Sequence, residues 1–160
     1  MKRAFSIYVS GIFLVIVIAG CGAYLRTAEH KNEQYLHNHT LFNQGKYADA
    51  IAGFRGFAEK YPDDELADDA QYFLAYTLVY YANKDRDYEK GLAEFKRLLV
   101  KYPKSYWVKD AKNWVSQIEE ILSLKNDVSR QKAENEKLKK DIKDLMKTDI
   151  EMEKKRKKMK

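Results

Sequence analysis

Two segments of the chain resemble each other at a spacing of 41 residues. The only two prolines, Pro62 and Pro103, lie 41 residues apart, and each follows Lys-Tyr. Further pairs align at the same spacing: Tyr47 with Tyr88, Phe54 with Phe95, and Asp69-Ala70 with Asp110-Ala111. A fixed period in this range is typical of helical repeats, in which each unit buries its apolar face only against its neighbours. The spacing therefore predicts an all-α repeat fold, with Tyr47, Phe54, Tyr88 and Phe95 as its main packing residues.

The first unit carries a clear helical stripe. Apolar residues recur every three or four positions from Tyr47 to Tyr61, which is the spacing of one buried helix face. Pro62 then ends this helix, because the residue before a proline avoids the helical region. The first helix of the second unit is predicted over 69–81, with Ala75 at a position of close approach. Its predicted packing residues are Ala70, Phe73, Leu74, Leu78 and Tyr81.

The repeat has a recognisable consensus. The pattern Gly-x-Tyr-x-x-Ala-Ile-x-x-Phe over 45–54, closed by Pro62, resembles the second helix of the tetratricopeptide repeat. The Tyr-Pro endings followed by longer polar loops are similar to those of outer-membrane assembly (BamD-like) and Tol-Pal-associated (YbgF-like) lipoproteins. This resemblance implies a tetratricopeptide-like domain of about two and a half units over 33–124. It also implies a concave face, lined by the first helices, that holds a protein ligand.

The N-terminus predicts export. Lys2 and Arg3, an apolar run over 4–19 and Ile-Ala-Gly before Cys21 form a secretory signal peptide at 1–20. The run is shorter than the roughly 20 residues that span a bilayer. The site resembles the lipobox of bacterial lipoproteins, which implies a lipidated Cys21 followed by a tether over 21–32. By the same resemblance, Gly22 after the cysteine favours sorting of the protein to the periplasm-facing outer membrane. The outer leaflet of the inner membrane is the alternative location. The alternatives are an uncleaved anchor or an ordinary signal peptide with a chance cysteine.

A long C-terminal arm follows the repeats. Neither proline nor glycine occurs from Ser105 onward, so the third helix can continue without a break into a coiled-coil arm over 125–153. The seam at heptad positions a and d comprises Ile121, Leu124, Val128, Asn135, Leu138, Ile142 and Leu145. Acidic residues at g and lysines at e suit a parallel homo-oligomer. A single solvated helix, or a hairpin back onto the repeats, is the alternative.

A basic tail over 154–160 ends the chain. Six of the 30 Lys and Arg residues lie in it, namely Lys154, Lys155, Arg156, Lys157, Lys158 and Lys160. Without them and without Lys2 and Arg3, the 24 acidic residues slightly outnumber the basic ones. The basic balance therefore does not indicate a nucleic-acid-binding domain. The tail suits anionic lipid headgroups, cell-wall polymers or an acidic protein surface, and a solvated tail is equally compatible with the sequence.

Aromatic residues supply the candidate binding site. Tyr72, Tyr76 and Tyr80 recur every four residues, and Trp107 and Trp114 lie seven apart in the next predicted helix. Tyr and Trp are typical anchors of protein interfaces, so these five are the predicted partner contacts, for an extended or helical peptide. Ordinary packing between helices is the alternative.

Little in the sequence indicates catalysis. His37 and His39 point to different sides of a helix, and no phosphate-binding loop or nucleophile motif occurs. We expect no enzyme activity, metal, cofactor other than the covalent lipid, nucleic acid or small-molecule substrate. The predicted function is a lipid-anchored envelope scaffold or adaptor in an outer-membrane assembly or trans-envelope complex. An accessory lipoprotein of an envelope-sensing histidine kinase, or a cell-wall-binding protein, is the alternative.

Overall fold

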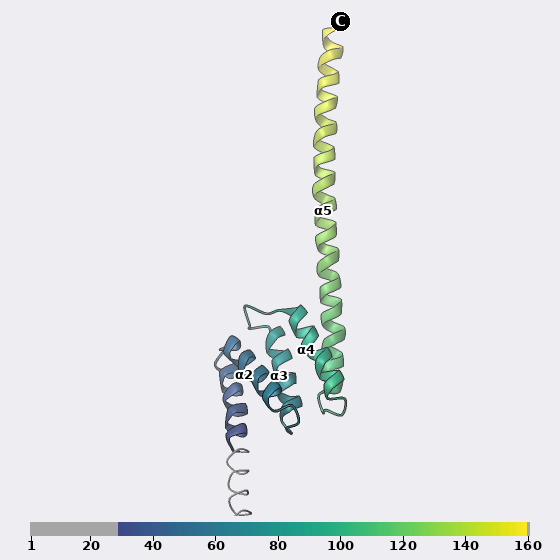
Figure 1. Cartoon of the computed structure of the whole chain (residues 1–160). Helices are drawn as coiled ribbons and strands as arrows, with labels where there is room; N and C mark the ends of the chain where they lie inside the picture. The colour runs from purple at the N-terminus through teal and green to yellow at the C-terminus, as the bar shows by residue number, and fades with distance from the viewer. Residues whose placement is uncertain (1–28, 160) are drawn as a thin grey trace, which may run out of the picture. The chain divides into compact units, whose positions relative to one another are not determined.

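The structure, a computed structural model, describes residues 29–159, and every regular element in this range is an α-helix. Helical residues 29–43 precede α2 (Tyr47–Lys60), α3 (Ala67–Val79), α4 (Tyr88–Lys101) and α5 (Val108–Lys158) (Figure 1). The chain divides into two units, Met1–Val115 and Ser116–Lys160. The predicted signal peptide and Cys21 lie outside the described residues. The last part of the predicted tether, 29–32, is helical.

The 41-residue period is confirmed by the helix boundaries. Both α2 and α4 run for 14 residues, and each bound of α4 lies 41 positions after that of α2. The starts of α3 and α5 differ by the same number. Equivalent positions are buried alike, since Phe54 and Phe95 are both 0% exposed. The N-terminal unit is therefore built from tetratricopeptide-like helix pairs, as the sequence predicts.

The core of the N-terminal unit forms around α3, which packs against both α2 and α4 (Figure 1). The predicted stripe of α2 is confirmed, and it meets three residues of α3. This cluster comprises Ala50, Phe54, Phe57, Ala58, Ala70, Leu74 and Leu78. Ala75 is fully buried, as predicted. The prediction for Tyr81 is wrong: α3 ends at Val79, so the helical spacing no longer applies, and Tyr81 is 79% exposed.

Tight packing between two helices explains one departure from the repeat consensus. Gly91 stands where the first unit has the small residue Ala50. A Cβ built at Gly91 would lie 2.2 Å from Cγ1 of Val79. The glycine is therefore required by the tight contact between α3 and α4, because any larger residue would force that valine to move.

An ionic network around one buried carboxylate also links the two repeats. Glu94 of α4 is almost fully buried, and its carboxylate accepts a hydrogen bond of 2.9 Å from Nε2 of Gln71 in α3. The same carboxylate lies 3.2 Å from Nη1 of Arg97 and 3.6 Å from Nη2 of Arg55. A buried carboxylate is tolerated only when it is paired in this way. This network aligns α2, α3 and α4 with one another.

The C-terminal unit is a single helical arm. α5 is one unbroken helix of 51 residues, as the absence of proline and glycine predicts. Every residue from 128 to 159 is exposed. Over the described range, 29–159, no helix is both long and apolar enough to span a membrane.

Candidate protein-binding face

Five aromatic rings gather around Tyr80 at the end of α3, and we call them the aromatic face: Phe42, Tyr47, Tyr76, Tyr80 and Tyr81. The ring centroid of Tyr80 lies 4.9 Å from that of Phe42 and 5.5 Å from that of Tyr47. It lies 5.4 Å from Tyr76 and 4.7 Å from Tyr81. Four of these rings are half-buried, and Tyr81 is exposed. The cluster is thus a fixed aromatic surface with one side open to solvent.

The backbone conformation at two positions brings the rings of the aromatic face together. Tyr80 is the residue after α3, and its ψ of 134° turns the chain out of the helix. Gly45, at a φ of 75°, makes the tight turn that sets Tyr47 beside Phe42, with their ring centroids 5.7 Å apart. Only glycine adopts this conformation without strain. The aromatic face is therefore contributed by helical residues 29–43, α2 and the end of α3.

Trp114, in the part of α5 that belongs to the N-terminal unit, adjoins the aromatic face. Its ring centroid lies 5.8 Å from that of Tyr76. It also stacks on Phe95, at 5.9 Å and an interplanar angle of 6°. Trp114 is half-buried, so it is held by the core and still offers part of its surface.

Tyr72 is buried against Trp107. Tyr72 is 8% exposed, and its ring stacks on that of Trp107 with centroids 4.0 Å apart. The indole N–H of Trp107 donates a hydrogen bond to the carboxylate of Asp69. We therefore correct the sequence-based interpretation of Tyr72 as a partner contact: it is a core residue, because Phe95 of α4 and Trp107, just before α5, cover it. Trp107 is half-buried, and the N–H of its indole ring is engaged.

The hydroxyls of Tyr72, Tyr76 and Tyr80 stay protonated at neutral pH. Burial raises the pKa of Tyr72 and of Tyr76 above the ordinary value. A hydrogen bond with Tyr81, together with burial, raises the pKa of Tyr80 to about 12. Tyr76 and Tyr80 therefore bring neutral hydroxyl groups to the aromatic face, and these can donate or accept hydrogen bonds.

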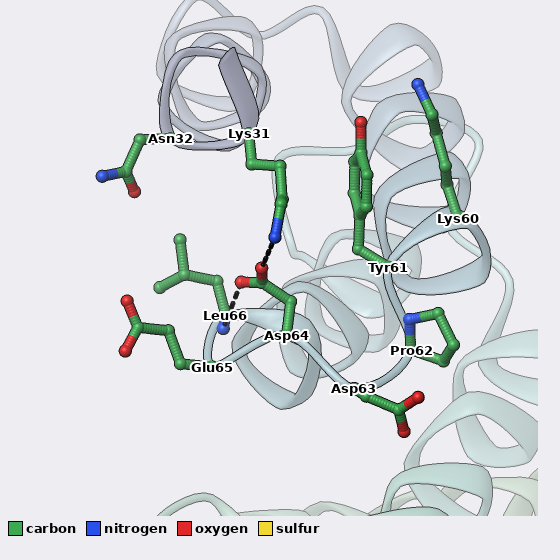
Figure 2. A pocket seen from close by; sticks show the side chains of 9 residues that line it. All are labelled: Lys31, Asn32, Lys60, Tyr61, Pro62, Asp63, Asp64, Glu65 and Leu66. Carbon is green, nitrogen blue, oxygen red and sulfur yellow. Dashed lines mark hydrogen bonds and ion pairs between the residues drawn. The ribbon is translucent and has the colours of Figure 1, made fainter. Parts of the chain in front are cut away.

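A polar pocket of about 560 Å3 lies between residues 31–32 and the loop after α2 (Figure 2). Figure 2 shows Lys31 pointing at Asp64, with Nζ 2.5 Å from Oδ2. The other carboxylate oxygen accepts the backbone N–H of Leu66 at 3.1 Å. Burial alone would raise the pKa of Asp64, but the bonds from Lys31 and Leu66 outweigh it and lower the pKa. The Asp64 carboxylate therefore holds the loop after α2 in place, and Lys31 already neutralises its charge.

The histidines show no metal-binding geometry. His39 is surrounded by rings, with centroids 4.3 Å from Phe73 and 5.0 Å from Phe54. Burial lowers the pKa of His39, although Asp69 opposes the shift. His37 is exposed. Within residues 29–159 no group of three or more His, Cys, Asp or Glu side chains could hold a metal ion.

Sequence reasoning missed part of the aromatic face. Tyr47 was predicted only as a packing residue, Tyr81 as a core residue, and Phe42 was not predicted at all. These rings lie close together because of the turn at Gly45 and the position at which α3 ends. Neither feature can be predicted from the helical spacing of apolar residues.

Comparison with known proteins agrees with the helix pairs. Residues 40–64 match the family model of the tetratricopeptide repeat. This range covers the turn at Gly45, all of α2 and the first part of the loop after it. No curated protein sequence matches the chain. The match and the repeated helix pairs together identify the N-terminal unit as tetratricopeptide-like, a class of module that typically binds other proteins.

Proposed function

We propose that the chain is a non-catalytic adaptor whose aromatic face holds a peptide segment of a partner protein. The main support for the proposal is the cluster of aromatic rings around Tyr80. This cluster lies on the tetratricopeptide-like unit and is partly exposed to solvent. Tyrosine is enriched among interface hot spots, because a large rigid ring gives much contact for little loss of conformational entropy. The hydroxyl groups add hydrogen bonds to the backbone or side chains of a bound peptide.

The adaptor is proposed to work at the cell envelope. The lipobox-like sequence before Cys21 supports a lipid anchor, and two or more acyl chains hold a protein stably at a membrane. The Tyr-Pro repeats, similar to those of outer-membrane assembly and Tol-Pal-associated lipoproteins, support a place in an outer-membrane assembly or trans-envelope complex. An envelope-sensing histidine kinase remains the alternative partner.

The aromatic face can be tested by comparing two substitutions. Tyr80→Ala removes the central ring, and Val100→Ala truncates a side chain that is 83% exposed on α4 and lies outside the face. If the ring is a hot spot, its loss costs at least about 2 kcal/mol of binding, roughly thirtyfold in affinity. Quantitative co-purification from cells should show one partner that is lost in Tyr80→Ala and retained in Val100→Ala. Retention in both variants, with the chain folded, would refute the proposed site.

The basic tail supports a second role in attachment to a polyanionic surface. Residues 154–159 are exposed at the end of α5, and only Lys157 is seen paired, with Glu153 at 3.0 Å. Sedimentation with purified peptidoglycan or with anionic vesicles, for the chain with and without residues 154–160, tests this role. Binding that is unaffected by the deletion would exclude it.

A further inference from the structure

The seam of α5 remains uncovered in the single chain. Five of its six apolar members are between 56% and 69% exposed, and the sixth, Ile121, is 38% exposed. The five are Leu124, Val128, Leu138, Ile142 and Leu145. Scattered exposed leucines need no explanation, but these recur at heptad spacing along one helix. An apolar stripe of this kind is stabilised when another helix packs against it and removes its side chains from water.

We propose that α5 pairs with α5 of a second copy of this chain, in parallel and in register, as a two-stranded coiled coil. The residue types at the seam select this geometry. Three of the four a positions carry the β-branched residues Ile121, Val128 and Ile142, with Asn135 at the fourth. Three of the four d positions carry Leu124, Leu138 and Leu145, with Gln131 at the fourth. β-Branched residues at a with leucine at d favour two parallel strands over three or four.

Charges beside the seam favour the parallel direction. In a parallel pair, each g residue faces the e residue five positions later on the other helix. Three such pairs are attractive, namely Glu120 with Lys125, Asp127 with Lys132, and Glu134 with Lys139. An antiparallel pair would instead set e beside e and g beside g. Lysines would then face lysines and acids would face acids, so the charge pattern disfavours that arrangement.

Asn135 fixes the register. It occupies an a position between Val128 and Ile142, and in the single chain its Nδ2 bonds only to the carbonyl of Gln131, at 3.0 Å. In a parallel in-register pair, the two Asn135 side chains meet each other across the seam. A lone asparagine at a specifies register and two-strandedness, because a shifted register would place it against an apolar residue.

The occupant is a second copy because the recognition pattern is complementary to itself. The g acids and e lysines that pair across the seam all belong to this one sequence. In the single chain, Asp127 lies 2.9 Å from Arg130, and Lys139 lies 3.0 Å from Glu136. Exposed pairs within one helix contribute little, so they do not compete strongly with pairing across the seam. The pairing uses residues other than the aromatic face, so its test does not depend on any partner.

Disulfide trapping in cells, on the full-length chain, tests both direction and pairing. Leu124→Cys and Leu145→Cys place thiols at d positions near the two ends of the seam, where facing residues come within disulfide reach. The matched controls are Asn126→Cys and Lys147→Cys, which lie at f positions on the opposite side of the helix. The parent chain, whose only cysteine is Cys21, gives the background.

Each d variant alone should form a covalent dimer at least about fivefold above its f control. Equal crosslinking at d and f would overturn the proposal, and so would no crosslinking at any position. Dimers that form only when the Leu124→Cys and Leu145→Cys chains are co-expressed would show antiparallel pairing, which also overturns it.

A charge exchange provides an independent check that keeps the apolar seam intact. Lys132→Glu with Lys139→Glu turns four attractive pairs of the dimer into four repulsive ones. We expect at least about tenfold weaker self-association, which corresponds to about 1.4 kcal/mol. Mixing this chain with one that carries Asp127→Lys and Glu134→Lys should restore pairing as a heterodimer. Undiminished self-association of the first variant, or no rescue by the second, would contradict the proposed register.

Discussion

Replacing Phe54 by alanine tests the repeat packing. The ring is fully buried, and its centroid lies 5.0 Å from that of His39 and 5.7 Å from that of Phe73. Phe→Ala in such a site loses the transfer free energy of the ring and leaves a cavity, at a cost of about 3–5 kcal/mol. Small domains have only about 5–15 kcal/mol of stability in total. Phe54→Ala should therefore lower the melting temperature of the N-terminal unit by about 12 °C or more.

Tryptophan fluorescence is the suitable assay, because Trp107 and Trp114 are the only tryptophans and both lie in the N-terminal unit. Their emission during urea unfolding reports this unit without a contribution from the C-terminal arm. Tyr81→Ala is the control, since truncation of an exposed ring should change stability by less than about 0.5 kcal/mol. If Phe54→Ala unfolds at the same urea concentration as the parent chain, the core packing described above is wrong.

Four further substitutions address other parts of the fold. Asp87 caps α4 by accepting the backbone N–H of Lys90 at 2.9 Å, so Asp87→Ala should cost about 1 kcal/mol in the same urea assay. Gly91→Ala should cost about 1–3 kcal/mol because its Cβ would collide with a valine of α3. Gly56→Ala, where a Cβ meets nothing within 4 Å, should stabilise α2 by about 0.5–1 kcal/mol. Burial holds the pKa of His39 below its ordinary value of 6.5, so the unfolded chain takes up the proton more readily than the folded one. The stability due to its neutral ring is complete above pH 6.5 and is lost as the pH falls below that value. Melting temperatures at pH 7.5 and 5.5 should show this loss, and His39→Phe should reduce it.

The repeat architecture could be predicted because burial repeats with the sequence. Phe54 and Phe95 occupy the same place in successive units, so the 41-residue period carries over to the helix bounds. The stop at Pro62 follows from backbone sterics alone, and α2 ends at Lys60. At these positions, the local preferences of the sequence and the packing of the whole unit favour the same structure.

The aromatic site could be predicted only in part. The four-residue spacing predicts one helical stripe of tyrosines, namely Tyr72, Tyr76 and Tyr80. The exposure of the three side chains nevertheless differs. Tyr72 is covered from both sides, Tyr76 is half-buried, and Tyr80 lies beyond the end of α3. Spacing shows which residues share a helix face, but it does not show which neighbouring helix covers that face. The contribution of Phe42 likewise depends on the turn at Gly45, which sets two helices side by side.

The most direct test of partner binding is photo-crosslinking in living cells from position 81. Tyr81 is the exposed ring of the aromatic face, and a photoreactive phenylalanine there keeps the aromatic character of the site. Val100, exposed on α4, is the control position. We expect one dominant envelope protein to be captured from position 81, not to be captured from position 100, and to be lost when Tyr80→Ala is added. Equal capture from both positions, or no capture by a folded and membrane-associated chain, would contradict it.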